Sequence, residues 1–168
     1  IDWNNKDFLL SSGAINCIWN GFTMNGREDK YTWSKAYVDN SQVVVVKRGS
    51  GISTLDDLAG KTVAVQSGSS ALSVLTDEEN SKMIKLKNSF KELKEYADYN
   101  AAFLALESGA VDAIAMDIGV AKYQIASRGE GYQQLETILA SEQYGIGFAL
   151  GDTELCDAVS KTLSEIMT

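Results

Sequence analysis

The chain has 168 residues, 45% of them hydrophobic, and its 23 Asp and Glu outnumber its 15 Lys and Arg, giving a formal net charge of −8. This acidic balance disfavours a nucleic-acid partner, because phosphate binding needs a basic face. The absence of histidine excludes Ser-His-Asp and Cys-His catalysis and disfavours a zinc site. Cys17 and Cys156 have no CxxC spacing, so we expect buried free thiols rather than a disulfide. No apolar run reaches the roughly 18 residues that would predict a membrane-spanning helix.

Helix-like and strand-like segments alternate along the chain, which is typical of an α/β fold with largely parallel sheets. In chain order, the sequence predicts a helix at 4–13, strands at 14–19 (AINCIW) and 41–47 (SQVVVVK), a helix at 53–60, a strand at 61–66, a helix at 67–80, a strand at 92–98, a helix at 99–109, a strand at 111–117, a helix at 118–129, a strand at 143–150 and a helix at 152–167. The polar residues 80–90 carry no clear pattern, and no element is predicted there.

Local signals support several of these elements. The four consecutive valines of SQVVVVK indicate a strand that is covered on both faces. A serine or threonine is expected to cap the helix at 53–60, and glycines are expected to end several helices. In the last helix, the residues expected to face inward are Leu155, Val159, Leu163 and Ile166.

The segment NGFTMNGRED, residues 20–29, follows the first predicted strand and is rich in small and hydrogen-bonding residues. Ligands of open parallel sheets bind beyond the carboxyl ends of the strands. Thr23 offers a hydroxyl and a backbone N–H, and the planar guanidinium of Arg27 matches a carboxylate in two parallel hydrogen bonds. The bland alternative is that Arg27 is solvated or forms a surface ion pair.

Two further strand ends carry polar residues. The turn at 66–70 (QSGSS) opens a helix, where backbone N–H groups and the helix dipole favour an anion, although such a turn is commonly only an N-cap. Asp117 closes the strand at 111–117 and suits an ammonium group, or else it caps the helix that follows. Two anion-holding segments and one carboxylate together match the charges of an α-amino acid.

Four strings in order, SSGAINCIWNGFTMNGRED with YTWSKAYVDNSQVVVVK, then TLDDLAGKTVAVQSGSSA, then ALESGAVDAIAMD, then YGIGFALGDTEL, resemble the solute-binding proteins of family 3, the polar amino-acid receptors of ABC importers. The resemblance covers essentially the whole chain. It implies a periplasmic-binding-protein-like fold of two α/β lobes with a hinge. The first lobe would comprise residues 1–40 and 142–168 and the second residues 41–141, with hinges near 38–41 and 141–145.

The resemblance also implies roles for individual residues. Thr23 and Arg27 would bind the α-carboxylate of the ligand from the first lobe. Ser70, with Ser69 beside it, would add donors from the second lobe. No metal and no cofactor are implied.

The α-ammonium group would be bound by Asp117, helped by backbone carbonyl groups near Asn20 and Gly21. Gln66 would lie near the ligand side chain. Among the aromatic residues, Phe22 and Trp33 are expected in the core.

Family members continue beyond both ends of this chain, so the resemblance implies a sequence truncated at both ends. We expect the first lobe to be incomplete, or to be completed by strand exchange with another copy in a dimer.

The function implied is binding rather than catalysis: extracytoplasmic capture of a polar amino acid, in the periplasm or on a lipid anchor at the outer cell surface, and delivery to an ABC permease by hinge closure. A ligand-sensing domain of a membrane receptor would use the same binding chemistry. A dehydratase-type enzyme on the same fold is the other alternative, for which only Asp117, a glutamate or a tyrosine could serve as acid or base. The third alternative is that a chain of this extent binds no ligand.

Overall fold

A computed structural model describes residues 2–167 of the chain. The chain divides into two compact units, one formed by the residues up to Asn40 and from Glu142 onward, the other by Ser41–Ser141. The chain passes between the units twice, within strand β2 (Val38–Lys47) and within strand β7 (Ala140–Tyr144).

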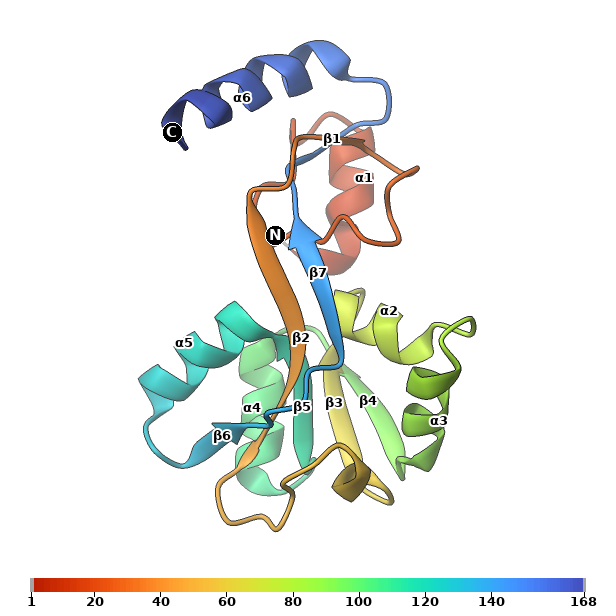
Figure 1. Cartoon of the computed structure of the whole chain (residues 1–168), viewed down its shortest axis with the longest axis vertical. Coiled ribbons are helices and arrows are strands. Elements are labelled where there is room, and N and C mark those ends of the chain that lie inside the picture. The colour runs from red at the N-terminus through yellow and green to blue at the C-terminus, as the bar shows by residue number, and fades with distance from the viewer. Residues whose placement is uncertain (1, 168) are drawn as a thin grey trace. The chain divides into compact units, whose positions relative to one another are not determined.

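The second unit is a sheet covered by helices (Figure 1). Besides β2 and β7, its elements are η2 (Asp56–Leu58), β3 (Thr62–Gln66), α2 (Ser70–Thr76), α3 (Ser81–Ser89), β4 (Glu92–Tyr96), α4 (Tyr99–Ser108), β5 (Ala113–Asp117), α5 (Ile118–Arg128) and β6 (Tyr132–Gln134). The strand order is β4-β3-β5-β2-β6, and β7 pairs with β2.

The sheet is mixed, which corrects the prediction of largely parallel sheets. Strand β3 runs parallel to β4 and β5, and helices lie between these strands in the sequence, as parallel neighbours require. Strand β2 runs antiparallel to both β5 and β6. It is followed by a loop and the short η2 rather than by a crossover helix, so the chain reverses direction before it enters β3.

The four valines of β2 are buried, and alternate valines enter two separate cores, as a strand with a period of two requires. Val44 and Val46 belong to the core that includes the buried residues of α2 and α3. Val43 and Val45 belong to the core of α4 and α5. The prediction of a strand covered on both faces is confirmed.

Helix boundaries in the second unit follow from local capping. Asp98 accepts a hydrogen bond from Ala101 N–H at the start of α4, and Gly109 ends this helix with φ +78°, a conformation that favours glycine. Asn80 caps α3 in the region for which the sequence predicted no element. At 53–60 the expected cap is wrong: Asp57 accepts hydrogen bonds from Ser53 N–H and Thr54 N–H, and only the short η2 forms.

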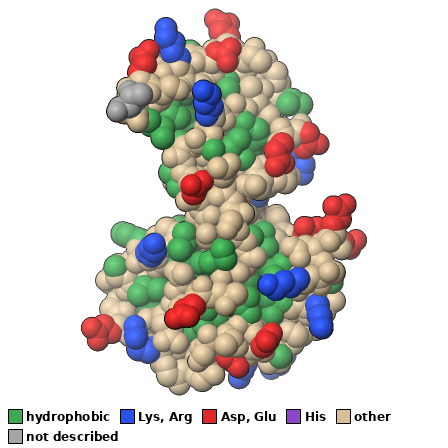
Figure 2. Space-filling model, viewed as in Figure 1, with side chains coloured by type: hydrophobic (Ala, Val, Ile, Leu, Met, Phe, Trp, Pro, Cys, Tyr) green, Lys and Arg blue, Asp and Glu red, His purple; other side chains and the backbone are tan. Residues whose placement is uncertain are grey.

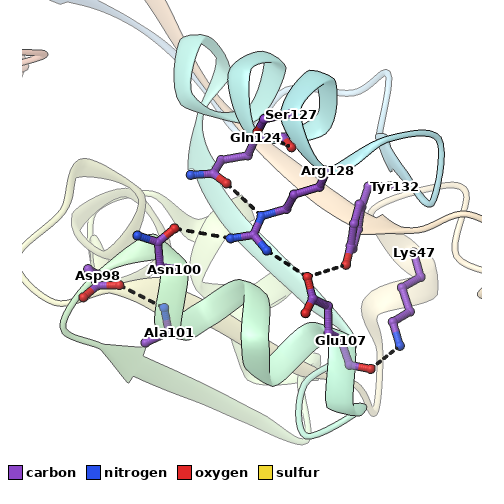
Figure 3. Close-up of polar contacts among 9 residues, drawn as sticks. All are labelled: Lys47, Asp98, Asn100, Ala101, Glu107, Gln124, Ser127, Arg128 and Tyr132. Atoms are coloured by element: carbon purple, nitrogen blue, oxygen red, sulfur yellow. Dashed lines mark hydrogen bonds and ion pairs between the residues drawn. The ribbon is translucent and has the colours of Figure 1, made fainter.

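Arg128 joins α4 to α5 in the second unit (Figure 3). Its guanidinium donates to Glu107 Oε1 and Gln124 Oε1, both at 2.8 Å, and to Asn100 Oδ1 at 3.3 Å, and lies 4.7 Å from the ring centre of Phe103. Gln124 lies on α5 with Arg128 and orients its guanidinium, whereas the contacts to Glu107, Asn100 and the ring of Phe103 bind α5 to α4.

The first unit contains η1 (Trp3–Asn5), α1 (Lys6–Ser11), the two-stranded sheet of β1 (Thr32–Trp33) and β8 (Gly147–Phe148), and α6 (Thr153–Ile166). Its aromatic centre is fully buried Phe22, which packs against Trp3, Tyr31 and Trp33 at centroid distances of 4.8 to 5.6 Å. The expected core positions of Phe22 and Trp33 are confirmed, whereas Trp19 is 52% exposed.

Two predictions for the first unit are wrong. Residues 14–19 form no strand; within the described residues, this segment contributes only a single antiparallel bridge, from Ile18 to Gly147, because no longer strand lies beside it to complete a ladder. Ile166 is 76% exposed, because it lies at the end of α6 beyond the core that Leu155, Val159 and Leu163 pack against.

The two cysteines are free, Cys156 buried and Cys17 half-buried, and burial raises the pKa of the Cys17 thiol. On the face drawn in Figure 2, acidic and basic side chains are interspersed rather than gathered. Among residues 2–167, no helix is both long and apolar enough to cross a membrane.

Candidate functional site

Asp117 ends strand β5 in the second unit, and its half-buried carboxylate is held from two sides. Gln42 Nε2 donates to Oδ1 at 2.8 Å, and the Tyr99 hydroxyl donates to Oδ2 at 3.2 Å. Asp117 also stands at the N-cap position of α5, but its side chain makes no capping hydrogen bond. The helix-cap alternative therefore does not describe this carboxylate.

The turn at 66–70 ends the neighbouring strand β3. Because β3 and β5 are parallel neighbours, Gln66 and Asp117 finish at the same edge of the sheet. Ser69 is 3% exposed, and its hydroxyl oxygen accepts from Leu72 N–H, so this side chain caps α2. Gln66 Nε2 donates to Ala97 O at 3.2 Å, which ties the turn to the end of β4.

Thr23 lies in the first unit and is 2% exposed. Its hydroxyl donates to Glu142 Oε1 at 2.8 Å, and Asn40 Nδ2 donates to the same oxygen at 2.5 Å. Glu142 is itself 5% exposed, so its carboxylate is buried between two donors. The hydroxyl proton of Thr23 is thus directed to a protein carboxylate.

Arg27 is half-buried in the loop that contains Thr23. Its Nη1 donates to Thr23 O at 3.0 Å, and its guanidinium lies 5.4 Å from the ring centre of Phe22. The backbone oxygen of Arg27 accepts from Trp33 Nε1 at 3.0 Å. The loop is therefore anchored to the aromatic centre of the first unit at both its side chain and its backbone.

Asn20 and Gly21 precede Thr23 in the same loop. Asn20 is exposed, and Gly21 has φ +60° with the ring of Tyr144 about 3.5 Å from where a Cβ atom would lie. Burial raises the pKa of the nearby Tyr37, and a hydrogen bond from the Gly21 backbone partly offsets this rise.

Each unit thus gathers half of the predicted residues. The structure places Gln66, Ser69, Ser70 and Asp117 at one sheet edge of the second unit, and Asn20, Gly21, Thr23 and Arg27 in one loop of the first. Three polar residues that hold these side chains were missed in the sequence: Gln42, Tyr99 and Glu142. The position of Tyr99 directly after the helix-capping Asp98, near the same edge, was the one available signal for it.

The first unit also has an open groove of about 460 Å³ between α1 and two loops. Phe8 and Leu150, each 70% exposed, contribute to its lining. None of the predicted site residues lines it, although Lys30 and Tyr31, which follow Arg27 in the same loop, do.

Solved structures of ligand-binding α/β proteins match the whole chain. A substrate-binding protein of an ABC uptake transporter from Streptococcus pneumoniae, solved with bound histidine, superposes with a TM-score of 0.91 at 31% identity, covering 100% of this chain and 69% of that one. The holo arginine-binding protein of T. maritima superposes with a TM-score of 0.84 at 28% identity, covering 100% of this chain and 71% of that one.

Sequence comparison agrees. The model of a family described as "ABC transporter, phosphonate, periplasmic substrate-binding protein" matches residues 34–168. The ABC transporter glutamine-binding protein GlnH of Bacillus subtilis is 29% identical over 160 residues, 94% of this chain and 55% of that protein. The arginine-binding extracellular protein ArtP of the same organism is 27% identical over 168 residues, 99% of this chain and 63% of that protein.

The chain belongs to this family of periplasmic substrate-binding proteins of ABC transporters. The resemblance inferred from the sequence and the α/β periplasmic-binding-protein fold are both confirmed. The chain spans little more than half the length of the glutamine-binding relatives it matches, 55% and 56%.

Proposed function

We propose that this chain binds a polar amino acid outside the cytoplasm and delivers it to an ABC permease. The observation that carries the proposal is the position of Asp117. Its carboxylate is held by two donors at the sheet edge where β3 ends and the turn at 66–70 begins. A preorganised carboxylate suits an ammonium group, and the adjacent turn supplies N–H donors. Relatives named for glutamine and arginine, and a neighbour solved with histidine, support an amino-acid ligand.

The roles that we propose for the individual residues follow the two charges of an amino-acid zwitterion. Arg27 and the Thr23 segment would bind the α-carboxylate, with donors from Ser69 and Ser70. Asp117 would bind the α-ammonium, helped by backbone carbonyls of Asn20 and Gly21, and Gln66 would lie near the ligand side chain. Burial of a charged ligand is tolerable only when both charges are paired, which requires a cationic group such as Arg27 and a carboxylate such as Asp117.

The mechanism we propose is hinge closure between lobes formed by residues 1–40 with 142–168 and by residues 41–141, with hinges near 38–41 and 141–145. Each lobe offers only part of the hydrogen bonds that a zwitterion needs. The open form would therefore be favoured without ligand and the closed form with ligand.

A phosphonate is the second candidate ligand, because the matching family is described by it. A phosphonate would bring its negative charge to the sheet edge where Asp117 ends β5. Like charges at short range oppose binding, whereas an ammonium is attracted. This favours the amino acid.

We propose that the chain binds its ligand without converting it, that it works in the periplasm or on a lipid anchor, and that it serves a transporter rather than a receptor's sensing domain. A strand-exchanged dimer is also proposed. Light scattering on the protein as it elutes from a size-exclusion column measures its molar mass and so tests for the dimer. A monomeric mass at all protein concentrations would contradict it.

The test of the proposed function is calorimetric titration of the protein with each of the twenty amino acids and with methylphosphonate. Truncating one partner of a buried charge pair costs about 2–5 kcal/mol, so Arg27→Ala and Asp117→Asn should each weaken amino-acid binding at least tenfold. Asp157→Asn, on the exposed face of α6, is the matched control. Binding of methylphosphonate alone, or unchanged affinity in both variants, would refute the proposal.

A further inference from the structure

Gln42 lies directly opposite Asp117 in the antiparallel ladder of β2 and β5. Its side chain is completely buried, and its Nε2 donates to Asp117 Oδ1 at 2.8 Å. A fully buried amide is costly unless it is hydrogen-bonded, and this contact satisfies the donor end of the amide.

Each oxygen of the Asp117 carboxylate receives a donor. Gln42 holds Oδ1, and the hydroxyl of half-buried Tyr99 holds Oδ2 at 3.2 Å. Two donors on two different oxygens fix the orientation of the carboxylate plane. Each carboxylate oxygen can accept more than one hydrogen bond, so these two contacts do not exclude a further donor.

The amide of Gln42 and the hydroxyl of Tyr99 are both neutral donors. A lysine or arginine at position 42 would pair with Asp117 and compete with an incoming cation, whereas an amide orients the carboxylate and leaves its charge in place. The arrangement therefore prepares Asp117 for a ligand that brings a positive charge.

The backbone of Gln42 is held as well. Its carbonyl oxygen accepts from Leu139 N–H at 2.8 Å, and Leu139 directly precedes β7. Gln42 itself is the second residue of the second unit, which begins at Ser41 within β2. The residue that orients Asp117 is thus anchored to both segments through which the chain enters and leaves this unit.

We propose that Gln42 is a positioning residue, which orients the Asp117 carboxylate toward the α-ammonium group of the ligand. Because Gln42 lies in β2 and its carbonyl oxygen accepts from the residue before β7, the orientation of Asp117 depends on both crossing strands. Tyr99 supports the same carboxylate from α4. The inference rests on the proposed function, since it assigns Asp117 to an ammonium group.

The test compares Gln42→Met, which keeps the length of the side chain and removes its donor, with Gln133→Met on the neighbouring β6 as the matched control. The first readout is the Asp117 side-chain rotamer in the ligand-free protein, from NMR scalar couplings or a crystal structure. The second is the affinity for the best-bound amino acid and for its counterpart that lacks the α-ammonium group.

We expect Asp117 to populate more than one rotamer in Gln42→Met and one rotamer in the control. Hydrogen bonds to charged groups contribute about 1.5–3 kcal/mol, so amino-acid affinity should fall roughly tenfold to a hundredfold. Affinity for the des-amino counterpart should stay within about twofold, because it makes no use of Asp117; a general loss of structure would lower both affinities alike. Tyr99→Phe deletes one oxygen atom from a half-buried side chain and should show the same pattern more weakly, which keeps the test decisive if Gln42→Met does not fold.

The two hypotheses fail in different ways. If the unaltered protein binds no amino acid, the proposed function fails, and the rotamer of Asp117 still decides whether Gln42 positions it. If the unaltered protein binds, but Gln42→Met and Tyr99→Phe keep both the single rotamer and the native affinity, the positioning role is wrong. Equal loss of affinity for both ligands would overturn it too.

Discussion

Glu142 offers a sharp test of how the first unit is held together at its two crossing segments. Its buried Oε1 accepts from Thr23 Oγ1 at 2.8 Å and from Asn40 Nδ2 at 2.5 Å. Glu142→Ala removes the acceptor from both donors, and each buried donor deprived of its acceptor costs about 1–3 kcal/mol, so we expect a loss of about 2–6 kcal/mol. Glu142→Gln presents an oxygen at the same place and can keep both contacts, so it should cost only about 1 kcal/mol as charge-assisted bonds become neutral.

The assay is urea unfolding followed by tryptophan fluorescence. All three tryptophans, Trp3, Trp19 and Trp33, belong to the first unit, so their emission reports this unit. Glu28→Ala, an exposed glutamate of the same unit, is the matched control. An unfolding midpoint for Glu142→Ala equal to that of the control would refute the reasoning, and so would equal losses in the Ala and Gln variants.

Gly147→Ala should destabilise the first unit by about 1–3 kcal/mol in the same assay, because a Cβ there would lie 2.6 Å from the buried Phe22 ring; an unchanged midpoint would contradict this. Arg128→Lys keeps the charge but loses the planar fork toward Glu107, and we expect a loss of about 1–2 kcal/mol by far-UV circular dichroism, against none for an exposed control. Burial first, and Glu107 second, raise the pKa of Tyr132 above its unfolded value of about 10. Its contribution to stability is therefore complete below about pH 10 and is lost as the pH rises further, so unfolding midpoints should fall as the pH rises above about 10, and should fall less in Tyr132→Phe.

The elements that the sequence predicted well are those whose signals are local. The valines of β2 are apolar without interruption, and this pattern alone indicates a strand with two covered faces. The common sheet edge of Gln66 and Asp117 was predictable because each ends an apolar run, and parallel strands present their carboxyl ends at one edge. The mixed direction of the sheet was missed because it depends on how β2 connects to its neighbours, which a pattern of hydrophobicity does not contain.

The residues that hold the site were missed for a related reason. Gln42 and Asp117 are 75 residues apart in the sequence, and Asn40 and Glu142 are 102 residues apart. In the sequence, a single polar residue within a strand looks the same whether its side chain faces water or a buried carboxylate. Residues 14–19 show the opposite error. Their strand-like sequence predicted a strand, but among the described residues this segment forms only one bridge, from Ile18 to Gly147.

Thr23 separates a role in ligand binding from a role in packing. A hydroxyl has one proton, and that of Thr23 is donated to Glu142, so the oxygen that remains can only accept. A ligand carboxylate also only accepts. It therefore gains nothing from the Thr23 hydroxyl unless that hydroxyl gives up its hydrogen bond to Glu142. We expect Thr23→Val to lower the unfolding free energy by about 1–2 kcal/mol, as a buried acceptor loses its donor, and to change amino-acid affinity less than Arg27→Ala does. Calorimetry that finds the two variants equally impaired in binding, with the stability of Thr23→Val unchanged, would show that the hydroxyl serves the ligand instead.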